Sequence, residues 1–386
     1  MKIVLLTHSL FFGGAERQLV LLAKGLHQRG HTVVVVPFYS GGPLEQELVD
    51  AGIPIRSLNK KGRWDIWAIV RRLPQVIQQE VPDVVHSYHG TPNLMSLVLK
   101  LFRLPPKVVW GIRCSNMDLI YYDWVVAPLD QITAWLSRFA DAHIANSQTG
   151  LSHHVAIGYP AEKMVHIPNG VDTTRFRPDQ AARVRVREEW GVSTEDRLIG
   201  LVARLDPIKG HSVFLEAASR LARRDSCIKF VCVGDGPATY RAELQHHAQK
   251  LGLEDRLRWA GARADMPAVL NALDLAVNSS LSEGLSNAIS EAMACGVPCA
   301  VSDVGDSAWM VGSTGAIVPP NDPEALADAM GRMVTAREPD PTTIRRRILD
   351  HLSVDALVIT TERTLLALCH QPTGKPVTPR EKTPVC

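Results

Sequence analysis

Short runs of apolar residues, each followed by an amphipathic segment of helical length, recur along almost the whole chain. The first half opens with KIVLLT (2–7), continues with a helical pattern over about 15–28 that Gly30 ends, and then gives HTVVVVPF (31–38). This order predicts a β-α-β unit. Strands that are apolar throughout and separated by helices indicate a parallel sheet covered by helices on both faces.

The same pattern occurs in both halves of the 386-residue chain, which is too long for one ordinary hydrophobic core. Further strands are predicted at 83–87, 107–111 and 142–146, and then at 197–203, 228–234, 256–261, 275–280 and 297–302. Between the two sets, residues 165–180 contain two prolines and an Asn-Gly pair, which favours a linker. We therefore predict an α/β protein of two doubly wound, Rossmann-like domains that face each other across a cleft, with residues 1–170 in the first and 171–352 in the second.

The bulk properties exclude several classes of protein. A formal net charge of +2 gives no electrostatic reason to expect a nucleic-acid partner. No uninterrupted apolar stretch is long enough for a membrane span, and the apolar run after Lys2 is too short for a secretory signal. The seven cysteines are scattered without a CxxC pair, which favours free thiols in a reducing compartment. We expect a cytoplasmic protein with a disordered, proline-rich tail over 371–386.

Two basic residues and two glutamates follow neighbouring strands of the predicted second sheet. Arg204 and Lys209 lie on the loop RLDPIKG after strand 197–203, and Glu283 lies on the loop after strand 275–280. Because the carboxyl ends of parallel strands meet at one edge of a sheet, we expect these side chains to converge there. An arginine fork and a lysine point charge can together hold a diphosphate and stabilise the negative charge that develops as a bond to it breaks. The chain contains no D-x-D, so we expect no metal and no other cofactor.

Glycines at the same edge allow a ligand to approach the backbone. The run GDGP at 234–237 forms a tight turn, and Gly284 opens the loop before a helix that we expect Ser286 to cap. The free N–H groups at the start of that helix suit a phosphate. The candidate donor-binding residues of these loops are Asp235, Gly236, Gly284, Leu285 and Ser286.

The two glutamates are expected to have different roles. Glu291 lies in the second turn of the helix, where it can accept hydrogen bonds from ribose hydroxyls, and Glu283 lies nearest to the sugar end. The alternatives are structural: Arg204 and Glu283 could form an ion pair, Glu291 could be a solvated helix residue, and Lys209 could be an ordinary turn lysine. Chance placement of the whole set on consecutive strand ends is a weaker explanation.

Five motifs together resemble the family 4 retaining glycosyltransferases of the GT-B fold. They are GGAE (13–16), IPNGVDTTRF (167–176), GLVARLDPIKG (200–210), VGDGP (233–237) and EGLSNAISE (283–291), and the similarity covers roughly residues 1–365. No single motif is decisive, whereas their number, order and spacing are. The resemblance implies that Arg204 and Lys209 grip the donor diphosphate, that Glu283 lies near the donor sugar and that Glu291 binds the ribose.

The resemblance implies further features. The loop with Gly13 and Gly14 would close over the donor, Asp235, Gly236 and Arg263 would lie near the nucleotide, and a last helix over 353–370 would cross back to the first domain. The family often has a catalytic histidine that contacts the donor sugar, commonly in an H-x-H motif. Here His86 is followed by Tyr88 and then His89, so either histidine could have this role; we favour His86.

The acceptor side is less defined. The polar loop GIRCSNMDL offers Arg113, Asn116 and Asp118, and His89 could join them; alternatively this is a surface loop. The segment 62–73 carries Trp64 and Trp67 with two arginines at helical spacing, which could contact an anionic membrane surface or could place the tryptophans in the core.

We interpret the basic runs at 183–187 and 345–347 as solvated helix faces.

The predicted function is transfer of a sugar, with retention, from a nucleotide-diphosphate sugar to a hydroxyl acceptor. A UDP- or GDP-sugar is the expected donor, and a polysaccharide or lipid-linked glycan precursor is the expected acceptor, with possible contact at the inner face of the cell membrane. Alternatives are a nucleotide-sugar epimerase and a non-catalytic sugar-nucleotide-binding protein. A glycosidase is the weakest, because its paired carboxylates need no diphosphate grip.

Overall fold

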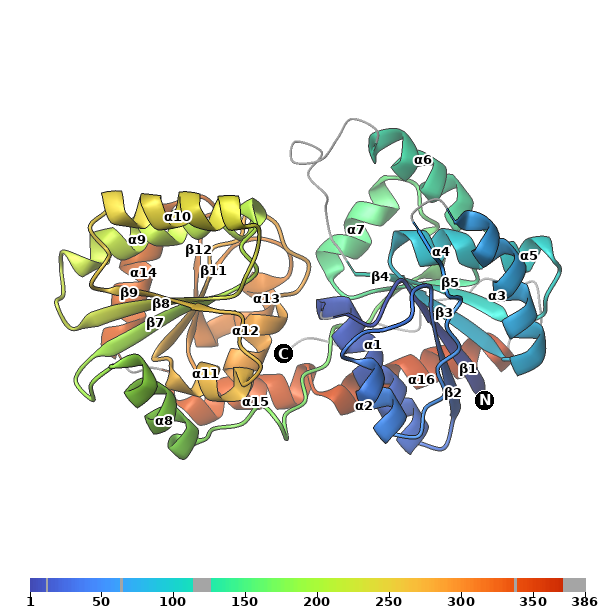
Figure 1. Ribbon diagram of the computed structural model, residues 1–386, viewed down its shortest axis with the longest axis horizontal. Helices are drawn as coiled ribbons and strands as arrows, with labels where there is room; N and C mark the ends of the chain where they lie inside the picture. Colours follow the sequence, from blue (N-terminus) through green and yellow to red (C-terminus); the bar gives the residue numbers. More distant parts are fainter. Residues whose placement is uncertain (12, 63–64, 114–125, 337–338, 371–386) are drawn as a thin grey trace. The chain divides into compact units, whose positions relative to one another are not determined.

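The computed structural model describes the chain except for residues 12, 63–64, 114–125, 337–338 and 371–386. The tail predicted to be disordered lies outside the described residues. The chain forms two compact units, and it passes from the first to the second between Gly170 and Val171. It returns to the first unit between Ser353 and Val354. Each unit contains a six-stranded sheet (Figure 1), and every strand pair is parallel.

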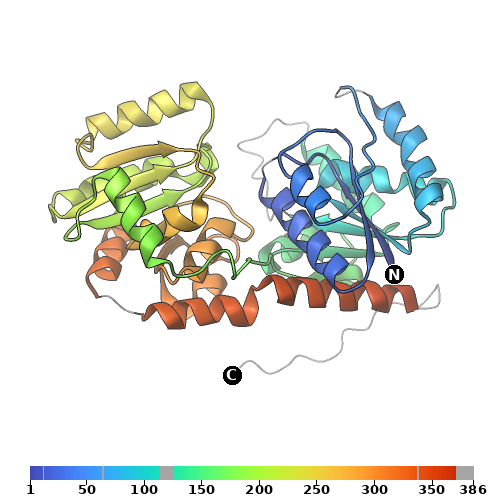
Figure 2. The same ribbon diagram turned by 60° about the horizontal axis from the view of Figure 1, so that its bottom comes forward.

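Unit 1 has the strand order β2-β1-β3-β4-β5-β6. Its strands are β1 (Lys2–Thr7), β2 (Thr32–Pro37), β3 (Val84–Tyr88), β4 (Lys107–Ile112), β5 (Ala142–Ala145) and β6 (Met164–His166). Its helices are α1 (Gly14–Gln28), α2 (Glu45–Asp50), α3 (Ile66–Glu80), α4 (Gly90–Ser96), α5 (Val98–Leu101), α6 (Val126–Ser137), α7 (Gln148–Ala156) and α16 (Val354–His370). One core lies under α1, α2 and α16, and the other lies under α3, α5 and α6. Figure 2 shows α16 running beside α1.

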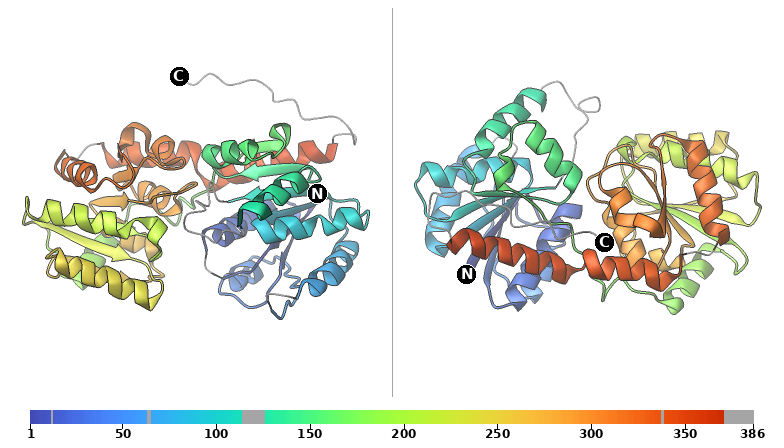
Figure 3. Two further views of the ribbon diagram at one scale, coloured as in Figure 1. Left: turned by 90° about the horizontal axis from the view of Figure 1, so that it is seen from above. Right: turned by 180° about the vertical axis from the view of Figure 1, so that it is seen from behind.

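Unit 2 has the strand order β12-β11-β10-β7-β8-β9. Its strands are β7 (Arg197–Val202), β8 (Ile228–Val233), β9 (Leu257–Gly261), β10 (Leu275–Asn278), β11 (Cys299–Ser302) and β12 (Gly315–Val318). Its helices are α8 (Gln180–Trp190), α9 (His211–Ala222), α10 (Ala238–Lys250), α11 (Met266–Ala272), α12 (Asn287–Ala294), α13 (Ser307–Val311), α14 (Pro323–Ala336) and α15 (Pro341–His351). One face of the sheet packs on α8, α11, α12, α13 and α15, and the other packs on α9, α10 and α14 (Figure 3).

The predicted α/β class with two Rossmann-like sheets is confirmed. The structure adds two short strands, β6 and β12, that the sequence pattern does not reveal. Strand β6 has three residues, none of them fully buried, and it overlaps the start of the segment predicted to be a linker. Strand β12 has four residues, of which only Val318 is buried. Short edge strands with little buried surface carry too weak an alternation to be recognised.

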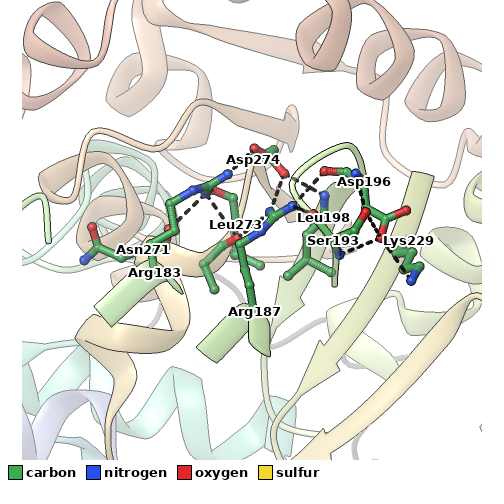
Figure 4. Close-up of polar contacts among 10 residues, drawn as sticks. Arg183, Arg187, Ser193, Asp196, Leu198, Lys229, Asn271, Leu273 and Asp274 are labelled. Atoms are coloured by element: carbon green, nitrogen blue, oxygen red, sulfur yellow. Dashed lines mark hydrogen bonds and ion pairs between the residues drawn. The ribbon is translucent and has the colours of Figure 1, made fainter. Parts of the chain in front are cut away.

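The interpretation of the two basic runs as solvated faces holds for Arg185 and Arg346, which are exposed, and is wrong for the other arginines of the runs. Arg187, whose side chain is 8% exposed, binds the Asp274 carboxylate at 2.9 Å and the carbonyls of Ser193 and Asp196 (Figure 4). Arg345 likewise donates to the carbonyls of Phe176 and Thr173. A guanidinium has five donors, so one arginine can satisfy several carbonyl groups at the ends of helices and strands.

Asp274 is expected to be a major stabilising residue of unit 2. Its carboxylate accepts hydrogen bonds from Arg183 at 2.6 Å, from Arg187 and from the Leu198 N–H at 2.7 Å, just before β10 begins (Figure 4). Asp274→Ala leaves a nearly buried guanidinium without an anion, which costs about 3–5 kcal/mol. Thermal or denaturant unfolding measures this. Asp328→Ala, which breaks an exposed pair with Arg224, should change stability little. Equal effects of the two substitutions would contradict the assignment.

Candidate active site

Lys209 and Glu283 are brought together at the carboxyl edge of the unit 2 sheet. The Lys209 ammonium lies 2.6 Å from Glu283 Oε1, and both side chains are largely buried, at 20% and 12% exposed. The same carboxylate oxygen accepts a hydrogen bond from the Ser280 hydroxyl at 3.0 Å and lies 3.5 Å from the Asn278 amide. Three donors therefore converge on one oxygen of Glu283, which fixes the carboxylate and holds a cation beside it.

The local fold explains why these two residues meet. Pro207–Lys209 form a 3₁₀ turn that Asp206 caps by accepting from the Ile208 N–H. Gly210 follows with a φ of +63°, and an added Cβ there would collide with the Ser279 carbonyl. The Ser279 hydroxyl donates to the Gly210 carbonyl at 2.9 Å. Glycine is therefore required at position 210, both by the left-handed backbone and by the close approach of the loop after β10.

Neighbouring loops are joined to this pair by close backbone approaches. Gly234, at a φ of +144°, lies against the Ala203 carbonyl, and Gly305 lies against the carbonyls of Glu283 and Gly284. The Asp306 N–H donates to the Gly284 carbonyl at 2.9 Å. The carboxyl ends of β11, β10, β7 and β8 thus form one continuous polar edge built from backbone and short side chains.

The other predicted donor residues have varied surroundings. The Arg204 side chain is 78% exposed and contacts only Asp206, at 3.3 Å, among the described residues. Asp235 pairs with Arg241 and accepts from the Gly236 N–H. Arg263 binds Glu189 and Asp265, and these two carboxylates raise the pKa of its guanidinium. Arg263 therefore lies in an ion-pair network away from the Lys209–Glu283 pair.

Helix α12 begins at Asn287 with Ser286 as its N-cap residue. The Ser286 side chain makes no capping hydrogen bond, so the predicted capping role is wrong. Gly284 and Leu285 lie in the loop before the helix, and Glu291 lies half-buried in its second turn. The N–H groups in the first turn of α12 thus receive no hydrogen bond from the Ser286 side chain. This turn begins just after the loop that carries Glu283, and an anion there could accept from the helical N–H groups.

In unit 1 the structure separates the two candidate histidines. His86 lies inside β3, 0% exposed, with Nδ1 hydrogen bonded at 3.2 Å to the Val109 carbonyl. Burial, with a contribution from Arg113, lowers its pKa to about 3. A side chain enclosed in the core cannot reach a substrate here, so the preference for His86 as the catalytic histidine is corrected. His89 lies just after the strand at a φ of +72°, and the Asn93 N–H at the start of α4 donates to its carbonyl.

Polar residues follow four adjacent strands of the unit 1 sheet. His8 follows β1, Tyr39 follows β2, His89 follows β3 and Arg113 follows β4. Leu6 pairs with Ser87, so His8 and His89 occupy equivalent places on neighbouring strands. The pKa of His89 is lowered, first by burial and then by Arg113 and His8, while Glu16 opposes the shift. These side chains form the polar carboxyl edge of unit 1.

Gly13 and Gly14 begin α1, and Gly13 is its N-cap residue. The Glu16 carboxylate turns back over Gly13, so an added Cβ at position 13 would collide with it. Glu16 is the third residue of the helix, and a negative charge in the first turn interacts favourably with the positive end of the helix dipole. The glycine pair thus brings an acidic side chain to the same edge as His8 and His89.

Sequence reasoning missed several members of both edges. Each of these residues lies at or within two residues of the end of a strand, and that position is the signal that could have identified them: Asn278 ends β10, Ser280 lies two residues after it, His8 directly follows β1 and Tyr39 lies two residues after β2. Asn116, Asp118 and Trp64 lie outside the described residues.

The segment predicted to contact a membrane or the core is partly described. Trp67 is 75% exposed, which excludes a core position for it, and Arg72 donates to the Leu58 carbonyl. Among the described residues, no cluster of three or more His, Cys, Asp or Glu side chains could hold a metal ion.

Two family models match the two halves of the chain. Residues 12–175 match the model described as Glycosyltransferase Family 4, and residues 196–336 match the model described as Glycosyl transferases group 1. Together the two matched segments contain Gly13, His89, Lys209 and Glu283.

Curated relatives are similar over parts of their length. A D-inositol 3-phosphate glycosyltransferase of Corynebacterium glutamicum is 30% identical over 68% of this chain and 66% of the relative. A GDP-mannose-dependent alpha-(1-6)-phosphatidylinositol monomannoside mannosyltransferase of Mycolicibacterium smegmatis is 34% identical over 45% of this chain and 48% of the relative. The chain therefore spans between about half and two thirds of these relatives.

Solved structures share the fold over nearly the whole chain. Anabaena HepE in complex with UDP and glucose superimposes with a TM-score of 0.82 at 24% identity, over 95% of this chain and 100% of that one. A sucrose-phosphate synthase from Thermosynechococcus elongatus gives a TM-score of 0.79 at 17% identity, over 95% and 98%. These similarities establish the GT-B arrangement of two Rossmann-like sheets.

Proposed function

The chain belongs to the family 4 glycosyltransferases of the GT-B fold, and on that premise we propose that it transfers a sugar, with retention, from a nucleotide-diphosphate sugar to a hydroxyl acceptor. The observation that carries the proposal is the Lys209–Glu283 pair at the carboxyl edge of the unit 2 sheet. Ligands of doubly wound folds bind at this edge. A largely buried cation beside uncapped helical N–H groups is suited to a diphosphate.

In this proposal the donor lies on unit 2. Lys209 and Arg204 bind the diphosphate, and the N–H groups around Leu285 and Ser286 bind a phosphate oxygen. Glu291, half-buried on α12, accepts hydrogen bonds from the ribose hydroxyls. Asp235 and Gly236 lie beside the nucleotide in this proposal. Arg263 does not contact the donor and instead forms ion pairs with Glu189 and Asp265.

Transfer proceeds in this proposal by attack of the acceptor hydroxyl on the face that the diphosphate leaves. The glycosidic C–O bond to the diphosphate breaks as the new C–O bond forms, and the hydroxyl proton passes to the departing phosphate oxygen. Lys209 stabilises the charge that develops on the leaving group. Glu283 keeps Lys209 in place; its Oε1 already accepts from Lys209 and Ser280, which argues against its acting as a nucleophile.

We further propose a UDP- or GDP-sugar as the donor and a glycan or lipid-linked glycan precursor as the acceptor. A similar structure contains UDP and a relative is named for GDP-mannose, which supports these two bases. No helix among the described residues is long and apolar enough to cross a membrane. Peripheral membrane contact is proposed from the exposed Ile66 and Trp67 at the start of α3.

The experiment that tests this function is a thermal-shift screen with UDP, GDP, ADP and dTDP and their sugar conjugates, in the presence of EDTA. A nucleotide sugar at 100 times its Kd stabilises the protein by about 2.7 kcal/mol, which moves Tm by several degrees. We expect one nucleotide to give this shift in EDTA and to lose it in Glu291→Ala. Absence of a shift with every nucleotide would contradict the proposed function, and a shift abolished by EDTA would contradict a metal-free site.

A further inference from the structure

Arg113 is an enclosed arginine whose guanidinium is incompletely paired among the described residues. By comparison, Arg187 and Arg263 each contact at least one carboxylate, and Arg345 donates to backbone carbonyls. Among the described residues, Arg113, half-buried just after β4, contacts a neutral amide, the Asn169 Oδ1 at 3.3 Å, and the ring of Tyr88 at 4.2 Å. Its Nε is buried and has no hydrogen-bond partner in the described structure. A partly desolvated guanidinium with a buried donor left unpaired is unfavourable, and a bound anion would satisfy that donor.

The charge of Arg113 acts on its neighbours. It lowers the pKa of His89 and of the buried His86, and it opposes the rise that burial causes in the pKa of Tyr88. These effects extend across the strand ends of β3 and β4. No carboxylate of the described residues pairs with Arg113, so its positive charge acts on both histidines.

Further donors continue along the same edge. The His8 ring packs on the Tyr39 ring with 4.9 Å between the ring centres. The Lys60 ammonium lies over the same Tyr39 ring, 5.2 Å from its centre. Burial, and after it the charge of Lys60, lowers the pKa of His8. The acidic group that acts on both His8 and His89 is Glu16 of α1. Among the described residues, the guanidinium of Arg113 and the imidazoles of His8 and His89 thus lie at neighbouring strand ends, with Lys60 and Glu16 close to His8.

We propose that this edge of unit 1 binds a phosphate group of the acceptor, with Arg113 as its principal ligand and His8 and His89 as further donors. The identification of the ligand as the acceptor rests on the proposed function, whereas the anion site itself is a property of unit 1. Arginine presents a planar fork that matches phosphate oxygens in pairs. This narrows the acceptor class proposed above to its phosphate-bearing members, either soluble or carried on a lipid.

The test uses inorganic phosphate and glycerol 3-phosphate, with glycerol as the neutral control, titrated by calorimetry into the full chain. The Lys209→Ala background removes the main cation of the unit 2 edge. We expect both phosphates to bind and glycerol not to bind. Arg113→Gln should weaken phosphate binding about tenfold or more, because it removes charge-assisted hydrogen bonds to the phosphate oxygens. Arg103→Gln, at an exposed arginine of the same unit, is the matched control and should leave binding unchanged.

A second readout is proton uptake. Bound phosphate raises the pKa of His8 and His89, so the calorimetric heat should depend on the ionisation heat of the buffer, and nuclear magnetic resonance should show the two imidazoles titrating at higher pH. If Arg113→Gln does not fold, Arg113→Lys replaces it and should give a smaller loss, since lysine keeps the charge without the fork. Phosphate binding that is unaffected by either Arg113 variant would overturn the proposal.

The source of the phosphate is distinguished by sedimentation with phosphatidylcholine vesicles that contain or lack phosphatidic acid. Binding to the acidic vesicles that depends on Arg113 identifies a lipid-carried phosphate, whereas binding of glycerol 3-phosphate alone identifies a soluble acceptor. Failure of all phosphate probes contradicts the proposal. The nucleotide thermal shift measured on wild-type protein separates the two hypotheses: its absence, with phosphate still bound at Arg113, contradicts the glycosyltransferase function alone.

Discussion

Lys209→Ala is expected to lower kcat/KM for sugar transfer by about 100- to 1,000-fold, which corresponds to about 2.7–4 kcal/mol of transition-state stabilisation. The ammonium is only 20% exposed and lies 2.6 Å from Glu283. An enclosed cation of this kind stabilises the charge that a departing diphosphate develops more strongly than a solvated one. Initial rates at several donor concentrations separate the loss in kcat from the rise in KM. Lys250→Ala, at an exposed lysine at the end of α10, is the matched control.

Glu283→Gln distinguishes the two roles considered for the glutamate. If Glu283 positions Lys209, the amide retains a hydrogen-bond acceptor, and activity should fall about tenfold, as expected when one charge-assisted hydrogen bond is weakened. If Glu283 were a nucleophile, Glu283→Gln would abolish transfer and wild-type enzyme would accumulate a covalent glycosyl intermediate detectable by mass spectrometry. Activity of Lys209→Ala within threefold of the wild type would contradict the diphosphate assignment outright.

Strand periodicity was sufficient to place most of this fold. The continuous apolar runs such as KIVLLT and HTVVVVPF form β1 and β2, and the loops after β7, β8 and β10 meet at one edge as parallel topology requires. The convergence of Lys209 with Glu283 follows from that topology alone. What the pattern cannot supply is side-chain direction within a strand. His86 and His89 are three residues apart, yet one is enclosed by the core and the other lies beyond the strand end.

The contacts of the arginines in the basic runs could not be predicted from the sequence either. A basic run at helical spacing has the same pattern whether its side chains meet solvent or carbonyl groups. Arg187 binds Asp274 and backbone carbonyls, and Arg345 binds backbone carbonyls, because the ends of several elements lie within reach of each guanidinium. The contact of Arg187 with Asp274 joins residues 87 positions apart, and that of Arg345 with Thr173 joins residues 172 positions apart. Local patterning contains no information on such contacts.

Mild acid is expected to unfold unit 1 before unit 2. His86 and His143 are buried in β3 and β5 of unit 1, and burial lowers the pKa of each to about 3. His211, at the start of α9 in unit 2, has its pKa lowered to about 4, again by burial first. All three are 0% exposed. In the part of the chain that the structure describes, unit 1 therefore encloses two neutral imidazoles of this kind and unit 2 encloses one.

The sign follows from proton linkage. The unfolded chain binds these protons near pH 6.5, whereas the folded units bind them only near pH 3–4, so stability is complete above pH 6.5 and falls as the pH drops below it. At pH 5 each histidine removes about 2 kcal/mol, or about 4 kcal/mol from unit 1 and about 2 from unit 2. Hydrogen-exchange mass spectrometry of β3 and β5 against β7 and β8, at pH 7 and pH 5, measures the two units separately.

Substitution of one imidazole tests the cause of this asymmetry. His143 packs edge-on against Trp110 at 5.5 Å and against Tyr159 at 5.2 Å, so His143→Phe keeps an aromatic ring in this cluster while removing the titratable group. The variant should retain more protection in β5 at pH 5 than the wild type, by about 2 kcal/mol, with no gain at pH 7 beyond its packing effect. His246→Gln, at an exposed histidine of α10, should leave the acid response unchanged. Loss of protection in both units at the same pH, or in unit 2 first, would show that acid sensitivity arises from groups other than these enclosed histidines.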